Sequence, residues 1–245
     1  MTAGPTLLAA LVAAVAGAGE APQGVVRPVL TPLPPRPAQQ PVRPVRTPLP
    51  ARDDIAAAIV HPIVLRDAPD GGVVARVGRR TEFGSPRIVP VVRRDGEWLG
   101  VIATELPNGR VGWVRAAAVK LVQEPVRLDV ILSKRELRVM RHGRAVARMT
   151  IGIGAPATPT PTGEFAVTDG LRGWGPYGCC ILALSGHQTK LGQGWTGGDR
   201  LAVHGTSQLS TIGAAATLGC LRANAADLRR LLRLVHLGTR VRIST

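Results

Sequence analysis

The chain has 245 residues, of which 45% are hydrophobic and 19% charged, a balance that excludes a largely disordered protein and suffices for one large domain or two modest ones. The formal net charge of +15 favours an anionic partner, but it does not choose among a nucleic acid, an anionic membrane and an anionic cell wall. The odd cysteine count of three gives no disulfide framework, and the spacing of the cysteines gives no zinc site.

Residues 1–20 are predicted to be a signal or anchor segment. Leu7 to Ala18 is a short apolar run that ends in small residues, which suits a signal-peptidase cut. No Lys or Arg precedes the run, which is atypical of a secretory signal, and the run is too short to predict a transmembrane helix. We therefore expect an extracytoplasmic protein, anchored in the membrane if the segment is retained, with a cytoplasmic Ala-rich tail as the alternative.

Proline dominates the next segment, residues 21–55. Residues 22–50 contain ten prolines. Because proline lacks the amide donor and fixes φ, helix and central strand are excluded there. The segment is predicted to be an extended, partly stiff spacer, with an unselected disordered tail as the alternative.

Residues 56–124 are predicted to form short strands joined by tight turns, with turn signals at Asp95-Gly96 and Asn108-Gly109. The expected strands are Val73–Val77, Ile88–Val92, Trp98–Ala103 and Val111–Val114. The phrases RDAPDGGVVARV, VVRRDGEWLGV and GRVGWVRAAAV resemble bacterial SH3-like domains, small barrels that often bind wall peptides. On that resemblance Trp98 and Trp113 line a ligand groove; a packing module with the tryptophans in its core is the alternative.

Residues 125–245 combine a β meander with one helix. Period-two alternation from Leu128 to Leu132 and from Leu137 to Met140 predicts strands with one buried face, and His142 is expected to be exposed in the next turn. Asn224 is a good N-cap for a helix that Gly238 is expected to terminate. The apolar face of this helix is Leu228, Leu231, Leu232 and Val235, and a last strand is expected over residues 240–243.

A histidine and a cysteine lie where nucleophilic chemistry is possible. His204 precedes Gly205 at the end of an apolar run, and Cys220 comes sixteen positions later, directly after Gly219. A thiol attacks well only as a thiolate, and a nearby imidazole can take its proton. Backbone amides beside a glycine can stabilise an oxyanion. The cysteine, the histidine and the backbone amides beside the glycine suffice for acyl transfer, although a lone buried cysteine is more often a small hydrophobe.

The order of these motifs resembles the L,D-transpeptidase (YkuD-like) catalytic domain, whose signature is His-Gly, a spacer, then Ser/Thr-His-Gly-Cys. The matching pieces are His204-Gly205-Thr206 and Thr217–Arg222, and Thr158–Phe165 resembles the family's TPTGxF motif. The similarity covers about residues 126–243. It implies that the chain is mainly β: a small SH3-like barrel over residues 56–124, followed over residues 125–245 by an L,D-transpeptidase-type β-sandwich with a short C-terminal helix.

The resemblance also implies roles for individual residues. Cys220 is the expected nucleophile, His204 the general base, and the backbone carbonyl of Gly205 the third member of the triad. The amides of Gly219 and Cys220 are the expected oxyanion hole. Arg222 is expected to contact the substrate or brace the active-site loop.

Four other residues are expected to have either a structural role or a place in the substrate pocket. Tyr177 suits the wall of a substrate pocket, with simple packing as the alternative. His187 lies in a loop that related sequences often carry, so it either lines the donor cleft or is a polar loop histidine. Cys179 and Cys180 are expected to be structural thiols, because adjacent cysteines rarely pair with each other.

Enzymes of this family attack the bond after the third residue of a peptidoglycan tetrapeptide stem, release D-alanine and form a thioester. An amine of a neighbouring stem then resolves the thioester and gives a 3→3 cross-link. The resemblance therefore implies stem peptides as partners, carbapenem-type β-lactams as inhibitors, and a place in the cell wall or periplasm. No cofactor, metal or nucleic acid is expected.

Leu218 departs from the family pattern, which has histidine at that position. Leucine cannot hydrogen-bond or polarise the site, but the proposed nucleophile and base are both present, so we expect activity. One alternative is an L,D-carboxypeptidase, in which water resolves the thioester. Another is a non-catalytic wall-binding protein. A nucleic-acid binder comes last, because no basic run is interleaved with aromatic residues.

Overall fold

Strands dominate the part of the chain that the structure describes. The computed structural model describes residues 54–191 and 198–245, all of which fall in one compact unit. The expected signal or anchor segment and nearly all of the expected spacer lie outside the described residues. Within the two described ranges there is one α-helix, and no helix is long and apolar enough to cross a membrane. The prediction of a mainly β protein is confirmed.

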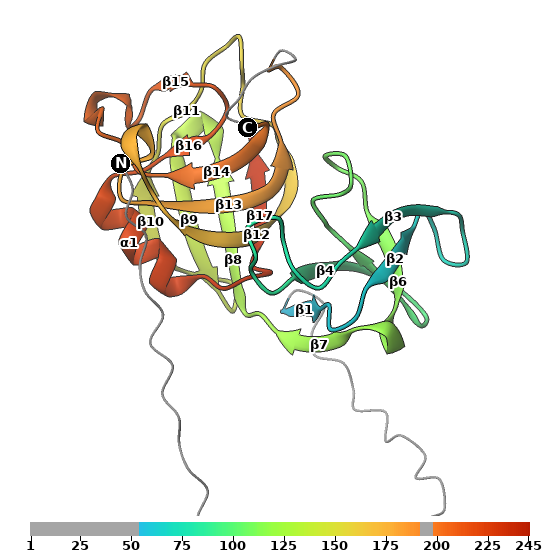
Figure 1. Ribbon diagram of the computed structural model, residues 1–245. Helices are drawn as coiled ribbons and strands as arrows, with labels where there is room; N and C mark the ends of the chain where they lie inside the picture. The colour runs from blue at the N-terminus through green and yellow to red at the C-terminus, as the bar shows by residue number, and fades with distance from the viewer. Residues whose placement is uncertain (1–53, 192–197) are drawn as a thin grey trace, which may run out of the picture. The chain divides into compact units, whose positions relative to one another are not determined.

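The first sheet has seven strands, and every neighbouring pair in it is antiparallel (Figure 1). In spatial order the strands are β3 (Val73–Val77), β2 (Ile63–Arg66), β6 (Gly112–Arg115), β5 (Trp98–Val101), β4 (Ile88–Asp95), β1 (Ile55–Ala58) and β7 (Lys120–Gln123). Gly96 and Gly109 have φ values of +51° and +79° in the expected turns, where glycine meets no Cβ penalty. The resemblance of this unit to an SH3-like barrel stays a prediction.

The two tryptophans of the first sheet differ in their surroundings. Trp98 is buried, with the guanidinium of Arg115 4.8 Å from its ring centre. Trp113 is half-buried and lines a cavity of about 420 Å³ together with residues 91–95 of β4. The core interpretation therefore holds for Trp98, and the groove interpretation is open for Trp113.

The second sheet has eight strands; it carries His204, and Cys220 directly precedes its edge strand. In spatial order these are β10 (Arg144–Thr150), β9 (Glu136–Arg141), β8 (Val126–Ile131), β17 (Arg240–Ser244), β12 (Gly163–Arg172), β13 (Cys180–His187), β14 (Arg200–His204) and β16 (Leu221–Arg222). The pairs β8–β17 and β14–β16 are parallel. A separate parallel pair joins β11 (Ile153–Gly154) to β15 (Ala215–Thr217).

Alternating burial explains the opening meander of this sheet. Val126, Leu128 and Val130 of β8 are buried while the residues between them are half-buried, and Leu137 and Val139 follow the same rule in β9. Because side chains alternate between the two faces of a strand, this pattern commits one face to the core. The predicted meander is confirmed.

The helix α1 (Ala225–Leu234) is capped as expected, because the side chain of Asn224 accepts a hydrogen bond from the amide of Asp227 at 2.8 Å. Leu228 and Leu231 are buried on its apolar face. The helix ends earlier than predicted. Gly238, at φ +84°, does not cap it, because its amide donates to the carbonyl of Val167 in β12 at 2.8 Å.

Candidate active site

His204 is the last residue of β14 and is buried. Its Nδ1 lies 2.6 Å from the carbonyl oxygen of Gly205. Because a carbonyl only accepts, Nδ1 carries the proton and Nε2 keeps its lone pair. Burial lowers the pKa of His204 below its ordinary value of 6.5; the bond to Gly205 opposes this shift, and the charge of Arg222 adds to it. The imidazole is therefore neutral at rest and able to accept a proton.

Cys220 directly precedes β16 and is half-buried. Its Sγ lies 3.8 Å from the carbonyl oxygen of Arg200 at the start of β14. Burial raises the pKa of the Cys220 thiol above its ordinary value of 9.0, while the backbone of Ala202 and the charge of Arg222 oppose the rise. The resting sulfur is therefore a neutral thiol and needs a base to ionise.

The parallel pairing of β14 with β16 brings the two residues together. In this register His204 lies opposite Arg222, and Val203 opposite Leu221. Cys220 lies just outside β16, two positions before Arg222, so its backbone is next to the strand that ends at His204. The sulfur's hydrogen-bond contact is with Arg200 rather than with His204. The role of Cys220 and His204 as a reacting pair stays a prediction.

Arg222 is half-buried and has its Nη1 3.5 Å from the side-chain oxygen of Gln208. The backbone of Arg222 exchanges two hydrogen bonds with Gly152, at 2.8 and 2.9 Å, which fixes β16 at this end. In the described part of the chain its buried Nε has no hydrogen-bond partner. The arrangement gives the site a fixed cation beside both reacting residues.

The turn before Cys220 is closed by the side chain of Thr217. Gly219, at φ +119°, donates its amide to Oγ1 of Thr217 at 3.0 Å, and that hydroxyl donates to the carbonyl of Cys220 at 2.6 Å. The amide of Gly219 is therefore engaged within the turn by the Thr217 side chain, and its place in an oxyanion hole stays a prediction. Of the two amides predicted to form the oxyanion hole, we assign that of Cys220 as the donor.

The turn is held from outside by the TPTG segment. The hydroxyl of Thr160 donates to the carbonyl of Gly219 at 2.8 Å and accepts from the amide of Gly154 at 2.9 Å. The hydroxyl of Thr158 donates to the carbonyl of Thr217 at 3.0 Å. The side chains of Thr158 and Thr160 therefore hold the turn that leads to Cys220, sixty positions after Thr160.

Gln188 is a positioning residue that the sequence did not reveal. It is buried, and its amide nitrogen lies 3.3, 3.0 and 3.1 Å from the carbonyls of Thr158, Pro159 and Leu218. A Cβ on Gly219 would lie 2.2 Å from this nitrogen. Gln188 therefore clamps the TPTG segment to the nucleophile turn. No local motif marks a glutamine whose partners are backbone carbonyls.

Tyr177 contacts His204, and His187 is bound to other parts of the chain. The Tyr177 ring meets the His204 ring edge-on, with centres 5.0 Å apart. The ring nitrogens of His187 lie 3.0 Å from a carboxylate oxygen of Asp199 and 2.8 Å from the carbonyl of Thr104. Both nitrogens are thus engaged within the protein, which favours the structural alternative for His187. Its assignment to substrate binding stays a prediction without geometric support.

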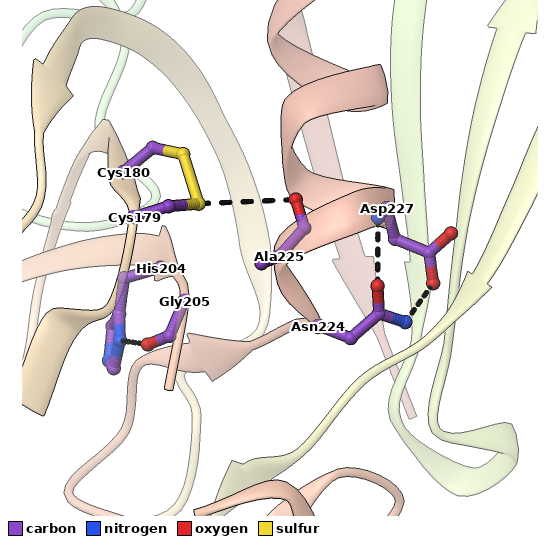
Figure 2. The surroundings of a disulfide bond; sticks show 7 residues. All are labelled: Cys179, Cys180, His204, Gly205, Asn224, Ala225 and Asp227. Carbon is purple, nitrogen blue, oxygen red and sulfur yellow. Dashed lines mark hydrogen bonds between the residues drawn. A yellow bond between two sulfur atoms is a disulfide. The ribbon is translucent and has the colours of Figure 1, made fainter. Parts of the chain in front are cut away.

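Cys179 and Cys180 are joined by a disulfide (Figure 2). The expectation that these neighbours are separate thiols was wrong, because sequence adjacency does not reveal the backbone conformation that lets two neighbouring sulfurs meet. Cys220 is the free cysteine. Among the residues that the structure describes, no group of three or more His, Cys, Asp or Glu is arranged to hold a metal ion.

Comparison with known proteins gives one consistent result. A family model described as the L,D-transpeptidase catalytic domain, YkuD, matches residues 125–243. Two YkuD proteins named as candidate L,D-transpeptidases are similar over 121 residues, at 34% identity for Bacillus licheniformis and 31% for Bacillus subtilis. Each match covers 49% of this chain and 66% of the relative.

Among solved structures, L,D-transpeptidase 3 from Mycobacterium tuberculosis with a faropenem-derived adduct is 16% identical. That match covers 57% of this chain and 69% of the other, at a TM-score of 0.42. The structure of the catalytic domain from Enterococcus faecium L,D-transpeptidase is 20% identical, covers 49% of this chain and 96% of the other, and has a TM-score of 0.37.

Proposed function

Residues 125–243 belong to the L,D-transpeptidase catalytic-domain family, and on that premise we propose that the protein is a cysteine acyltransferase that forms 3→3 cross-links between peptidoglycan stem peptides. The observation that carries the proposal is the hydrogen bond from Nδ1 of His204 to the carbonyl of Gly205. It leaves Nε2 unprotonated and able to act as a base. The chain spans 66% of the length of its curated relatives, so activity, substrate and partners are part of the proposal.

In the first half-reaction Nε2 of His204 takes the proton of the Cys220 thiol as sulfur attacks the carbonyl of the third stem residue. The amide of Cys220 donates to the oxyanion that forms. When the tetrahedral intermediate collapses, the C–N bond to D-alanine breaks. The imidazolium returns its proton to the leaving amine, and a thioester remains on Cys220.

The second half-reaction reverses these roles. An amine of a neighbouring stem attacks the thioester and gives its proton to His204, then the C–S bond breaks and the sulfur recovers a proton. General acid–base transfer of this kind is worth about 10²- to 10⁴-fold in rate. Water in place of the amine gives the carboxypeptidase reaction, which uses the same residues.

The neutral resting pair suits this sequence of proton transfers. The pKa of His204 is lowered and that of Cys220 is raised. Both groups are therefore neutral at rest, and the thiol gives its proton to His204 as the sulfur attacks a substrate carbonyl. Arg222 offers a cation whose Nε has no partner among the described residues. We assign it to a carboxylate of the stem peptide, and the ring of Tyr177 to one wall of the pocket.

The disulfide supports an extracytoplasmic location, because disulfides persist in oxidising compartments and are rare in the cytosol. A cell-wall ligand for the first sheet, at the cavity lined by Trp113, remains part of the proposal. So does acylation of Cys220 by a carbapenem, in which sulfur attacks the lactam carbonyl and the ring C–N bond opens.

The test is incubation of the purified protein with a disaccharide-tetrapeptide, followed by mass spectrometry of protein and products. The expected results are a thioester adduct, free D-alanine and a cross-linked dimer, all absent in Cys220→Ala. D-alanine and a tripeptide without dimer identify the carboxypeptidase. No adduct from any tetrapeptide or carbapenem, with sacculus binding retained by Cys220→Ala, overturns the enzyme and supports the wall-binding alternative.

A further inference from the structure

The Cys179–Cys180 disulfide lies where the loop after β12 enters β13. Cys180 is buried and opens β13, and Cys179 is half-buried just before it. The Sγ of Cys179 lies 3.9 Å from the carbonyl oxygen of Ala225, the first residue of α1 (Figure 2). The bond therefore sits between the active-site strands and the start of the helix.

One residue links this disulfide to the general base. The amide of Gly205 donates to the carbonyl of Cys180 at 3.1 Å, and the carbonyl of Gly205 accepts from Nδ1 of His204 at 2.6 Å. Figure 2 shows the disulfide and the His204–Gly205 pair in the same region. The backbone that orients the imidazole is thus held by the backbone of the disulfide pair.

The backbone around Gly205 is closely packed. A Cβ at this position would lie 3.0 Å from both the amide nitrogen of Cys179 and the carbonyl oxygen of Tyr177. A Cβ on Gly178 would lie 2.8 Å from the carbonyl carbon of Gly205. Backbone therefore contacts backbone here, so a shift of residues 179–180 moves Gly205 directly.

We propose that the Cys179–Cys180 disulfide is a positioning element of the active site, and that its reduction switches acyl transfer off while the nucleophile Cys220 stays chemically intact. The inference rests on the proposed function. The disulfide closes residues 179 and 180 into a small ring and restricts their backbone. Reduction opens the ring, lets Gly205 shift, and removes the fixed orientation of His204.

The reductant is a dithiol. Its thiolate attacks one sulfur of the disulfide, its second thiol resolves the mixed disulfide, and two electrons and two protons pass to the protein. The products are free thiols at positions 179 and 180 and an oxidised dithiol. Cys220 is already a free thiol, so the reductant leaves it unchanged. An enzyme that depended on Cys220 alone would be preserved by the same treatment.

The experiment measures the acylation and transpeptidation of the purified protein before and after dithiothreitol, with thiols counted by mass after alkylation. We expect one free thiol before reduction and three after it. Because displacing a catalytic group by about 1 Å can cost 10²-fold, kcat is expected to fall by about 10- to 100-fold. KM is expected to change by no more than about threefold, because loss of orientation acts on the chemical step.

A double variant, Cys179→Ser with Cys180→Ser, supplies the matched comparison. It is expected to have the low kcat of the reduced protein and no response to dithiothreitol. The melting temperature of Cys220→Ser with and without dithiothreitol separates local from global effects, since it requires no activity. A change of less than about 3 °C is expected for a local effect in a domain of this size.

Each result has one meaning. Oxidised protein that forms no adduct defeats the proposed function itself. Oxidised and reduced proteins that are equally active defeat only the positioning role. Three free thiols in the protein before reduction show that the disulfide does not form and overturn the inference. Loss of activity that merely parallels unfolding of Cys220→Ser overturns it as well.

Discussion

Arg222 carries the charge that tunes both reacting residues, and its substitution tests the electrostatics of the site. Its charge lowers the pKa of Cys220 and that of His204. Arg222→Gln is expected to raise both pKa values, so iodoacetamide alkylation of Cys220 moves to higher pH. Arg222→Lys keeps a cation and is expected to stay near wild type. Identical alkylation profiles for all three proteins would show that the charge does not reach the sulfur.

The pH profile of acylation follows from the same groups. His204 must be neutral to accept the thiol proton, and burial lowers its pKa below 6.5. The acid limb of kcat/KM is therefore expected below pH 6.5. An acid limb above that value would mean that His204 is stabilised as an imidazolium in the free enzyme, against the burial seen here.

Leu218 is not expected to mark a decayed enzyme. Its side chain is 47% exposed, and its carbonyl accepts from Gln188, so the turn does not depend on the side chain. Leu218→His and Leu218→Ala are each expected to change the free energy of unfolding by less than about 0.5 kcal/mol. Their carbapenem acylation rates are expected to stay within about threefold of wild type. A much larger gain for histidine would show that the family's residue does chemistry.

Gln188 joins the TPTG segment to the turn before Cys220 by hydrogen bonds. Gln188 is buried, and Gln188→Glu removes the donor to three carbonyls while keeping the size of the side chain; it is expected to destabilise the protein by about 1–3 kcal/mol. Acylation should slow at a pH where the protein is still folded. Gln123→Ala, at an exposed glutamine of β7, is the control and should change neither stability nor rate.

The elements were predictable where the signal was local. The alternation in β8 and β9, the glycine turns at positions 96 and 109, and the Asn224 cap all depend on neighbours a few residues away. The end of α1 was missed because Gly238 is used by β12, a partner about seventy positions earlier. The same reason hid Gln188 and the use of the Gly219 amide by Thr217, since the sequence does not state which distant groups meet.

Motif order predicted the candidate site better than composition did. His204, Gly205, Cys220 and Tyr177 were recognised from residues close to them in sequence, and the structure brings them to one region. For His187 the sequence leaves open a place in the donor cleft or a polar loop histidine, and its ring nitrogens find partners in Asp199 and Thr104. The disulfide between Cys179 and Cys180 is not predicted, because the rarity of bonds between adjacent cysteines does not reveal the local backbone conformation.

At the scale of the whole molecule, Glu124 is a buried carboxylate between β7 and β8. Burial raises its pKa above 4.5, while the nearby His236 opposes the rise. A raised pKa in the folded state means that the stability it contributes is present at low pH and lost as pH rises through the raised value. Glu124→Gln, which keeps an acceptor for the amide of Val126, removes this titration.

Thermal melts from about pH 4 to about pH 7 test this point. We expect the wild type to lose stability relative to Glu124→Gln as the pH rises. Glu97→Gln, at an exposed ion pair with Arg115, is the comparison and should show no such trend. A wild type that gains on Glu124→Gln over this range would mean that the pair with His236 outweighs burial.

The strand β17 lies between β8 and β12 in the middle of the second sheet. Its neighbours come from residues 126–131 and 163–172, so β17 joins the two halves of the sheet. Disrupting β17 is therefore expected to separate the meander of β8, β9 and β10 from the strands that carry His204 and Arg222.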